Sequence, residues 1–311
     1  MDRLIGTYTG TEKGPLLICF GSIHGNEPAG TQALERVFQM LAEEPIKNPS
    51  FQFAGRLIGL RGNLRAIQQG RRYLEKDLNR QWTPANVARI MKAQQGDLIA
   101  EDLEIREILE FIYAEIDSYQ AEKLIVLDLH TTTATGGIFV VVTADAESVQ
   151  IGTELHAPVI KGFLASIEGT TLHYFNTTNF SIPTVAVCFE SGQHQEPIAI
   201  SRAIAAIINC LRTIGCVHPS HIENKHDQLL QTYSAGLPKV VELILTHHIQ
   251  PADEFIMKPG YQNFQPVKKG EIVAVDKNGP IRVEQNCLML MPLYQQQGND
   301  GFFLVREVRP L

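Results

Sequence analysis

Five short, unbroken apolar runs constrain the fold of this chain more than any other feature. The runs are 16–20, 57–60, 124–127, 138–142 and 185–189. Runs without alternating polar residues are typical of strands buried on both faces, as in parallel sheets. Apolar residues at helical spacing lie between or after them, at 33–41, 98–116 and 198–211. The alternation predicts an α/β fold with a mixed, mainly parallel sheet flanked by helices.

The pattern changes after residue 222, where prolines and glycines recur between short β-like runs. These runs are 240–245, 271–275, 281–283, 287–291 and 302–305. Lys277-Asn278-Gly279 is a turn signal between two of them. We therefore predict two domains, an α/β domain at 1–222 and an all-β domain at 223–311, with a polar linker at 221–228.

Composition excludes several classes of protein. Lys plus Arg number 27 and Asp plus Glu number 34, so the net charge of −7 argues against a nucleic-acid partner. No apolar run approaches the ~20 residues that a membrane helix needs. The N-terminus lacks a signal-peptide pattern, and five scattered cysteines indicate free thiols in a reducing compartment. We expect a cytoplasmic protein without a membrane partner.

Polar side chains follow the first apolar run. His24 lies where the strand should end, and Glu27 comes three residues later, in the expected first turn of the next helix. Open α/β sheets bind ligands beyond the carboxyl ends of their strands. Imidazole and carboxylate are common zinc ligands, but a catalytic zinc site needs a third ligand and an open position. Taken alone, the pair is better explained as an ordinary histidine and an exposed helix-start glutamate.

Two further polar residues end apolar runs of the same predicted sheet. His130 follows 124–127 and Glu190 follows 185–189. A carboxylate at the end of a buried strand is costly without compensation, so we expect Glu190 to face a cavity, the alternative being a surface turn. With His24 and Glu27, these residues would meet at one edge of the sheet.

The segment 69–80 combines cations, an amide and an acid. Arg72, Asp77, Asn79 and Arg80 supply groups that bind anions such as carboxylates. Without context, a solvated basic loop is the preferred explanation of this segment.

Taken in order, these residues resemble the zinc carboxypeptidase superfamily and, within it, the succinylglutamate desuccinylase/aspartoacylase family. The motifs that carry the resemblance are Gly25-Asn26-Glu27, Asn63, Arg72-Tyr73, Asp77-Leu78-Asn79-Arg80 and Asp128-Leu129-His130-Thr131-Thr132, followed by Glu190. They span about residues 16–192. The β-rich tail also fits the C-terminal domain of such enzymes, so the resemblance covers nearly the whole chain.

The resemblance implies a metal site and the residue that orients it. His24, Glu27 and His130 would hold one zinc ion per chain. Asp77 would accept a hydrogen bond from His24 and so fix the tautomer of that ligand.

The resemblance also implies catalytic and substrate-binding roles. Glu190 would be the general base that deprotonates the attacking water and later protonates the leaving amine. Arg72 would polarise the scissile carbonyl and stabilise the oxyanion. Asn79 and Arg80 would clamp a substrate carboxylate.

The sequence departs from the family pattern at two places. Phe180 stands where relatives have a substrate-binding arginine, and 297–301 lacks the substrate-facing tyrosine of the aspartoacylase branch. We therefore expect substrates with one carboxylate, with Phe180 either facing the pocket or lying in the core. The alternative is that Lys161 or Arg71 replaces the missing arginine.

The function implied is a zinc-dependent hydrolase that cleaves the amide bond of a small N-acyl amino acid. The partner would be a small molecule with a carboxylate. One alternative is a metallocarboxypeptidase acting on short peptides, and another is an inactive zinc-binding recognition protein, although binding alone needs neither Glu190 nor Arg72. The oligomeric state, including a homo-oligomer, stays open.

Overall fold

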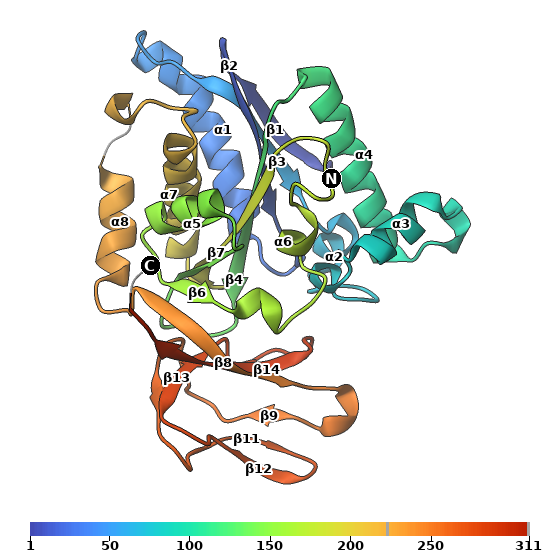
Figure 1. Ribbon diagram of the computed structural model, residues 1–311, viewed down its shortest axis with the longest axis vertical. Helices are drawn as coiled ribbons and strands as arrows, with labels where there is room; N and C mark the ends of the chain where they lie inside the picture. The colour runs from blue at the N-terminus through green and yellow to red at the C-terminus, as the bar shows by residue number, and fades with distance from the viewer. Residues whose placement is uncertain (222–223, 310–311) are drawn as a thin grey trace.

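The computed structural model describes residues 1–221 and 224–309, and an 11-stranded sheet forms its framework (Figure 1). In sheet order the strands are β1 (Leu4–Thr9), β3 (Ala54–Arg61), β2 (Glu12–Gly21), β4 (Leu124–Thr132), β7 (Thr184–Gln193), β5 (Phe139–Val142), β6 (Val159–Lys161), β8 (Val240–His248), β14 (Asp300–Glu307), β13 (Cys287–Leu290) and β10 (Pro266–Val267). Strands β3, β2, β4 and β7 are parallel to one another, whereas β1 and β5 are antiparallel to β3 and β7. The predicted mixed, mainly parallel sheet is confirmed.

Helices cover both faces of the parallel strands. The helices are α1 (Ala29–Lys47), α2 (Leu64–Gln69), α3 (Pro84–Lys92), α4 (Ala100–Tyr119), α5 (Ala146–Glu154), α6 (Thr171–Tyr174), α7 (Ile198–Thr213) and α8 (Lys225–Ser234). Helices α1 and α7 pack on one face and α4 and α6 on the other, as Figure 1 shows. Within the described ranges 1–221 and 224–309, no helix has the length and apolar character needed to span a bilayer.

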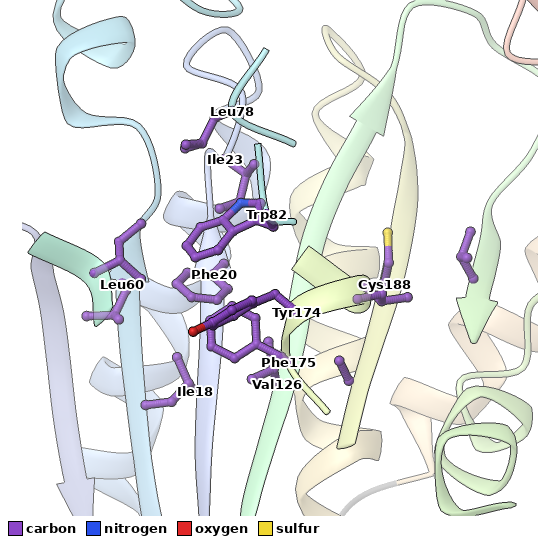
Figure 2. Packing of buried hydrophobic residues seen from close by; sticks show 14 of the residues in the cluster. Ile18, Phe20, Ile23, Leu60, Leu78, Trp82, Val126, Tyr174, Phe175 and Cys188 are labelled. Atoms are coloured by element: carbon purple, nitrogen blue, oxygen red, sulfur yellow. The ribbon is translucent and has the colours of Figure 1, made fainter. Parts of the chain in front are cut away.

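Strand β2 shows why its apolar run is unbroken. Successive side chains point to opposite faces of a strand. Ile18 and Phe20 enter the core under α4 and α6, while Leu17 and Cys19 enter the core under α1 and α7. All four are fully buried, so neither face tolerates a polar residue. Figure 2 shows the first of these cores, where Phe20 packs with its ring 5.6 Å from that of Phe175.

The C-terminal strands continue the main sheet and add a second one. Strand β8 is parallel to β6 and antiparallel to β14, so the main sheet runs on into the C-terminal region. A three-stranded antiparallel sheet of β12 (Gly279–Arg282), β11 (Ile272–Asp276) and β9 (Ile256–Met257) encloses a separate small core with β8, β13 and β14. This antiparallel region follows the pattern predicted after residue 222.

Helix α8 differs from the prediction. It occupies 225–234, which the sequence assigned to a linker and the start of an all-β tail. Leu230 is fully buried in the core that α7 shares with the sheet, which explains why this segment folds onto the α/β layers. The predicted boundary itself falls on 222–223, outside the described residues, and stays a prediction.

Candidate active site

The carboxyl edge of β2, β4 and β7 brings four predicted site residues together. His24 follows β2, and His130 and Glu190 are register partners near the ends of β4 and β7. The sequence predicted Glu27 in the first turn of the following helix. Helix α1 instead begins at Ala29, after Pro28, so Glu27 lies in the turn before the helix. All four side chains of the set are buried.

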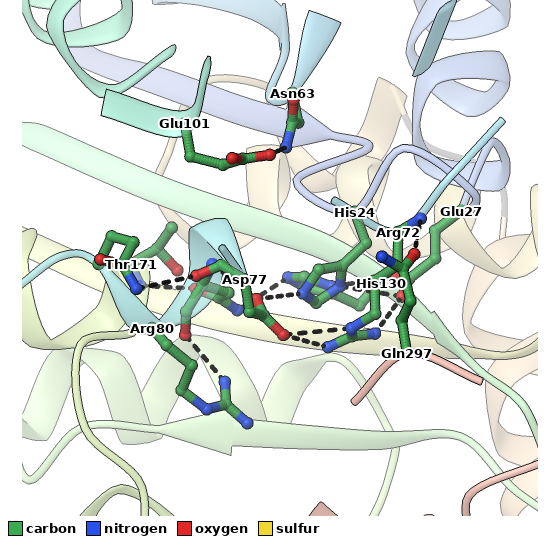
Figure 3. A network of polar contacts seen from close by, with 12 residues as sticks. His24, Glu27, Asn63, Arg72, Asp77, Arg80, Glu101, His130, Thr171 and Gln297 are labelled. Carbon is green, nitrogen blue, oxygen red and sulfur yellow. Dashed lines mark hydrogen bonds and ion pairs between the residues drawn. The ribbon is translucent and has the colours of Figure 1, made fainter. Parts of the chain in front are cut away.

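Glu27 contacts both imidazoles through its two carboxylate oxygens (Figure 3). Its Oε1 is 2.9 Å from His24 Nδ1, and its Oε2 is 3.1 Å from His130 Nδ1. Zinc ligands at about 2.0–2.1 Å in tetrahedral geometry lie roughly 3.3 Å apart. The three residues offer ligand atoms within 4.8 Å of one another, so this donor set fits a zinc ion. Burial alone would raise the pKa of Glu27, but the two histidines hold it well below its ordinary value.

The outer nitrogen of each imidazole faces a buried aspartate. His24 Nε2 is 3.1 Å from Asp77 Oδ1, the arrangement that the resemblance implied for Asp77. His130 Nε2 is 3.0 Å from Asp128 Oδ2, which also accepts a hydrogen bond of 2.5 Å from Thr171 Oγ1. Burial would lower the pKa of His130, but Asp128 and Glu27 raise it well above its ordinary value.

Sequence reasoning assigned no role to Asp128. It stands two residues before His130 in β4, so both side chains point to the same face of the strand. A charged residue inside an otherwise apolar strand was the signal that could have found it.

Glu190 faces the cavity at this edge of the sheet. Its Oε2 is buried and has no hydrogen-bond partner among the described residues. Burial raises the pKa of Glu190 to about 8. A buried carboxyl with an unpaired oxygen, opposite His130 in the sheet, can take up or release a proton near neutral pH.

Arg72 reaches the same cavity from the loop before Asp77. Its Nε and Nη2 donate hydrogen bonds of 3.1 and 3.0 Å to Asp77 Oδ2, and its Nη1 donates one of 3.3 Å to Glu27 Oε1 (Figure 3). Two buried carboxylates therefore fix the guanidinium beside the predicted metal ligands.

Asn79 and Arg80 lie on a 3-10 helix, η1 (Leu78–Arg80), that follows Asp77. The Oδ1 of Asn79 accepts a hydrogen bond of 2.9 Å from the backbone N–H of Thr171. Arg80 lines the cavity, and its Nη2 donates a hydrogen bond of 2.6 Å to Asp300 Oδ2. Asp300, in the 297–301 stretch that departs from the family pattern, was not recognised as a site residue.

Phe180, which stands at the position of the missing arginine, does not line the cavity. Neither do Lys161 and Arg71, the two cations considered as replacements for that arginine. Phe180 stacks on Phe175 with ring centroids 5.4 Å apart, in the aromatic core beside Tyr113. Of the two alternatives left open for its side chain, the core position is therefore confirmed and the pocket position is wrong. Among the described residues, the arginines and lysines that line the cavity are Arg72 and Arg80, so neither Lys161 nor Arg71 takes the missing place. His194 also lines the cavity and was missed; its Nδ1 is 2.7 Å from Thr131 Oγ1.

Comparison with known proteins identifies the family. Residues 13–214 match the family described as the succinylglutamate desuccinylase/aspartoacylase catalytic domain. The chain belongs to this family of hydrolases. The family assignment inferred from the motifs is thereby confirmed.

Relatives in sequence match parts of the chain. A probable aspartoacylase from Nostoc sp. is 32% identical over 122 residues, which are 39% of this chain and 36% of the relative. A succinylglutamate desuccinylase from Pseudomonas paraeruginosa is 39% identical over 69 residues, 22% of this chain and 19% of the relative. The matched segments thus span about a third or less of either relative.

Solved structures share the fold over nearly the full length. A succinylglutamate desuccinylase/aspartoacylase from Rhodobacter sphaeroides superposes with a TM-score of 0.64 at 16% identity, covering 96% of this chain and 86% of that chain. A succinylglutamate desuccinylase from Chromobacterium violaceum gives a TM-score of 0.62 at 17% identity, covering 99% and 95%. These likenesses establish the architecture, including the C-terminal strands.

Proposed function

We propose that this chain is a zinc-dependent hydrolase that cleaves the amide bond of a small N-acyl amino acid. One observation carries the proposal: the buried Oε2 of Glu190, which has no hydrogen-bond partner among the described residues, shares a cavity with Arg72 and with His24 and His130 of the cluster that includes Glu27. A binding protein would need the ligand cluster but neither the free carboxyl nor the guanidinium.

The three clustered side chains would hold one zinc ion per chain. Zinc supplies Lewis-acid activation of the attacking water, bringing its pKa toward about 7. Asp77 and Asp128 contact the Nε2 atoms of the two imidazoles and leave their Nδ1 atoms facing Glu27, so the two aspartates would orient His24 and His130 for binding the metal.

Glu190 moves the proton. Its carboxylate would accept a proton from the attacking water and then pass it to the nitrogen of the leaving amine. Burial favours the protonated form of the Glu190 carboxyl, which can donate its proton to the leaving amine. A nearby zinc ion would favour the ionised form, which can accept a proton from the attacking water.

Arg72 and Arg80 would have separate roles, oxyanion stabilisation and substrate binding. The Arg72 guanidinium, held by Asp77 and Glu27, lies where it can stabilise the negative charge that develops on the carbonyl oxygen. Arg80, with Asn79 beside it, would bind the substrate carboxylate and fix the amide over Glu190.

The test is release of primary amine from a panel of N-acyl amino acids and dipeptides. The protein is first stripped with a chelator and then reloaded with zinc or, as a control, with magnesium. We expect cleavage of N-acyl amino acids that depends on zinc. Cleavage of dipeptides alone would favour the carboxypeptidase alternative, and binding of zinc without any cleavage would favour the inactive recognition protein.

A further inference from the structure

Asp300 places a carboxylate of the chain itself on the predicted substrate-binding arginine. Its Oδ2 accepts a hydrogen bond of 2.6 Å from Arg80 Nη2, and its Oδ1 is 2.7 Å from His248 Nδ1. Asp300 is 9% exposed and lines the cavity. The contact comes from β14, so the C-terminal strands contribute a charged group to the site.

Little positive charge is left for the substrate. Arg72 is already engaged by two carboxylates, Asp77 and Glu27. Arg80 donates to Asp300 through Nη2 and to the backbone carbonyl of Asn79 through Nη1, which leaves its remaining N–H groups for one substrate carboxylate. Among the described residues no further arginine or lysine lines the cavity, so a second substrate carboxylate would lack a cationic partner there and would share the cavity with the negative charge of Asp300. Both effects disfavour its binding.

The rest of the cavity wall suits an apolar group. Six of its apolar side chains come from both parts of the chain: Val141, Phe163, Ile167, Leu172, Leu293 and Phe303. Phe163 and Phe303 pack together with ring centroids 4.8 Å apart, which joins the α/β layers to β14. The cavity lining therefore combines charged side chains, Arg80 and Asp300 among them, with a set of apolar side chains.

We propose that Asp300 is a specificity-determining residue that restricts this site to N-acyl amino acids with a single carboxylate and an apolar side group. The inference rests on the proposed function and deepens it, because it names the substrate class. It also replaces Phe180, a core residue, as the physical reason for preferring one carboxylate.

Three substrates of nearly equal shape test the inference on the wild-type protein. N-acetylleucine, N-acetylasparagine and N-acetylaspartate differ in polarity and charge while their side chains branch alike. We expect kcat/KM to fall in that order, with the dianion at least tenfold below N-acetylasparagine. An N-acetylaspartate value equal to or above that of N-acetylasparagine would overturn the inference.

Asp300→Asn removes the charge and keeps the shape. We expect the ratio of kcat/KM for N-acetylaspartate over N-acetylasparagine to rise at least tenfold in this variant. The matched control is Asp276→Asn, the same change at the turn between β11 and β12, away from the cavity, which should leave the ratio unchanged. An equal loss on all three substrates would show a merely structural role for Asp300 and overturn the inference.

Binding to a Glu190→Gln background separates this inference from the proposed function. Calorimetry on that variant, with and without Asp300→Asn, measures affinity for the same three compounds without turnover. The predicted order of affinities without cleavage by the wild type would uphold the selectivity of Asp300 and reject the hydrolase. Cleavage by the wild type together with equal affinities for the three compounds would support the hydrolase and overturn the selectivity assigned to Asp300. If Asp300→Asn does not fold, Asp300→Ser, which also removes the charge, takes its place in both measurements, while the wild-type and Glu190→Gln rankings test the substrate class.

Discussion

His130 and Glu190 lie directly opposite each other on the adjacent parallel strands β4 and β7. Register partners in a sheet point to the same face, and both side chains line the cavity. A slip of one residue would turn one of them to the opposite face. The sheet register itself therefore brings a predicted metal ligand beside the predicted base.

Loss of one imidazole should abolish zinc binding. His24→Ala and His130→Ala each remove one of three predicted ligands, and two protein ligands do not make a stable zinc site. We expect elemental analysis to give about one zinc per wild-type chain and almost none in either variant. His218→Ala, at an exposed histidine, serves as the control. Zinc content that survives His24→Ala would refute the assignment.

The aspartate behind His130 should tune metal affinity. Asp128→Asn removes the carboxylate that contacts His130 Nε2. Mutation of a residue that hydrogen-bonds a metal ligand typically lowers metal affinity by roughly 10- to 100-fold. Thr171→Val, which removes the hydroxyl that donates to Asp128, should weaken binding less. Competition with a chelator measures both, with Asp117→Asn on the exposed face of α4 as the control. Unchanged affinity in Asp128→Asn would mean that Asp128 only completes the core.

Zinc binding should release protons. Without metal, His130 has a pKa raised well above its ordinary value and Glu190 one of about 8, so both hold protons at pH 7. A ligating imidazole must lose its proton, and a nearby cation favours ionised Glu190. Zinc affinity should therefore increase as pH rises from 6 to 8. Calorimetry of zinc binding in two buffers of different ionisation enthalpy gives the number of protons released. Glu190→Gln should release fewer protons on zinc binding than the wild type.

The pattern of apolar and polar residues along the chain predicted the central strands and most residues of the candidate site. The apolar runs of β2, β4 and β7 indicate burial on both faces, and His24, His130 and Glu190 stand where each run ends. Together with the 69–80 segment and the residues flanking His24 and His130, their order along the chain indicated the family. This part of the site depends on short stretches of sequence that the sheet aligns.

The missed features depend on contacts between distant segments. Arg80 and Asp300 meet although 220 positions separate them, because β14 extends the main sheet beside the cavity. Phe180 could face the pocket or the core by sequence alone, and only its stacking on Phe175 decides. Helix α8 was missed because its buried contact, Leu230, is provided by tertiary packing and not by a strong local pattern.

The two arginines of the site should show different kinetic defects. Arg80→Ala removes a contact to the substrate carboxylate in both ground and transition states, so KM should rise roughly 10- to 100-fold. Arg72→Lys keeps a charge beside Asp77 and Glu27 but loses the planar donor, so kcat should fall, on the order of 10². Steady-state kinetics with these two signatures exchanged would reverse the role assignment.

The most direct measurement compares Glu190→Gln with wild type at equal zinc content. An amide cannot accept the proton of the attacking water, and loss of a general base reduces rates by roughly 10²–10⁴. The account predicts that, with fold and zinc content unchanged, amine release from N-acetylasparagine falls by that factor. Turnover near the wild-type rate in a zinc-loaded Glu190→Gln protein would contradict it.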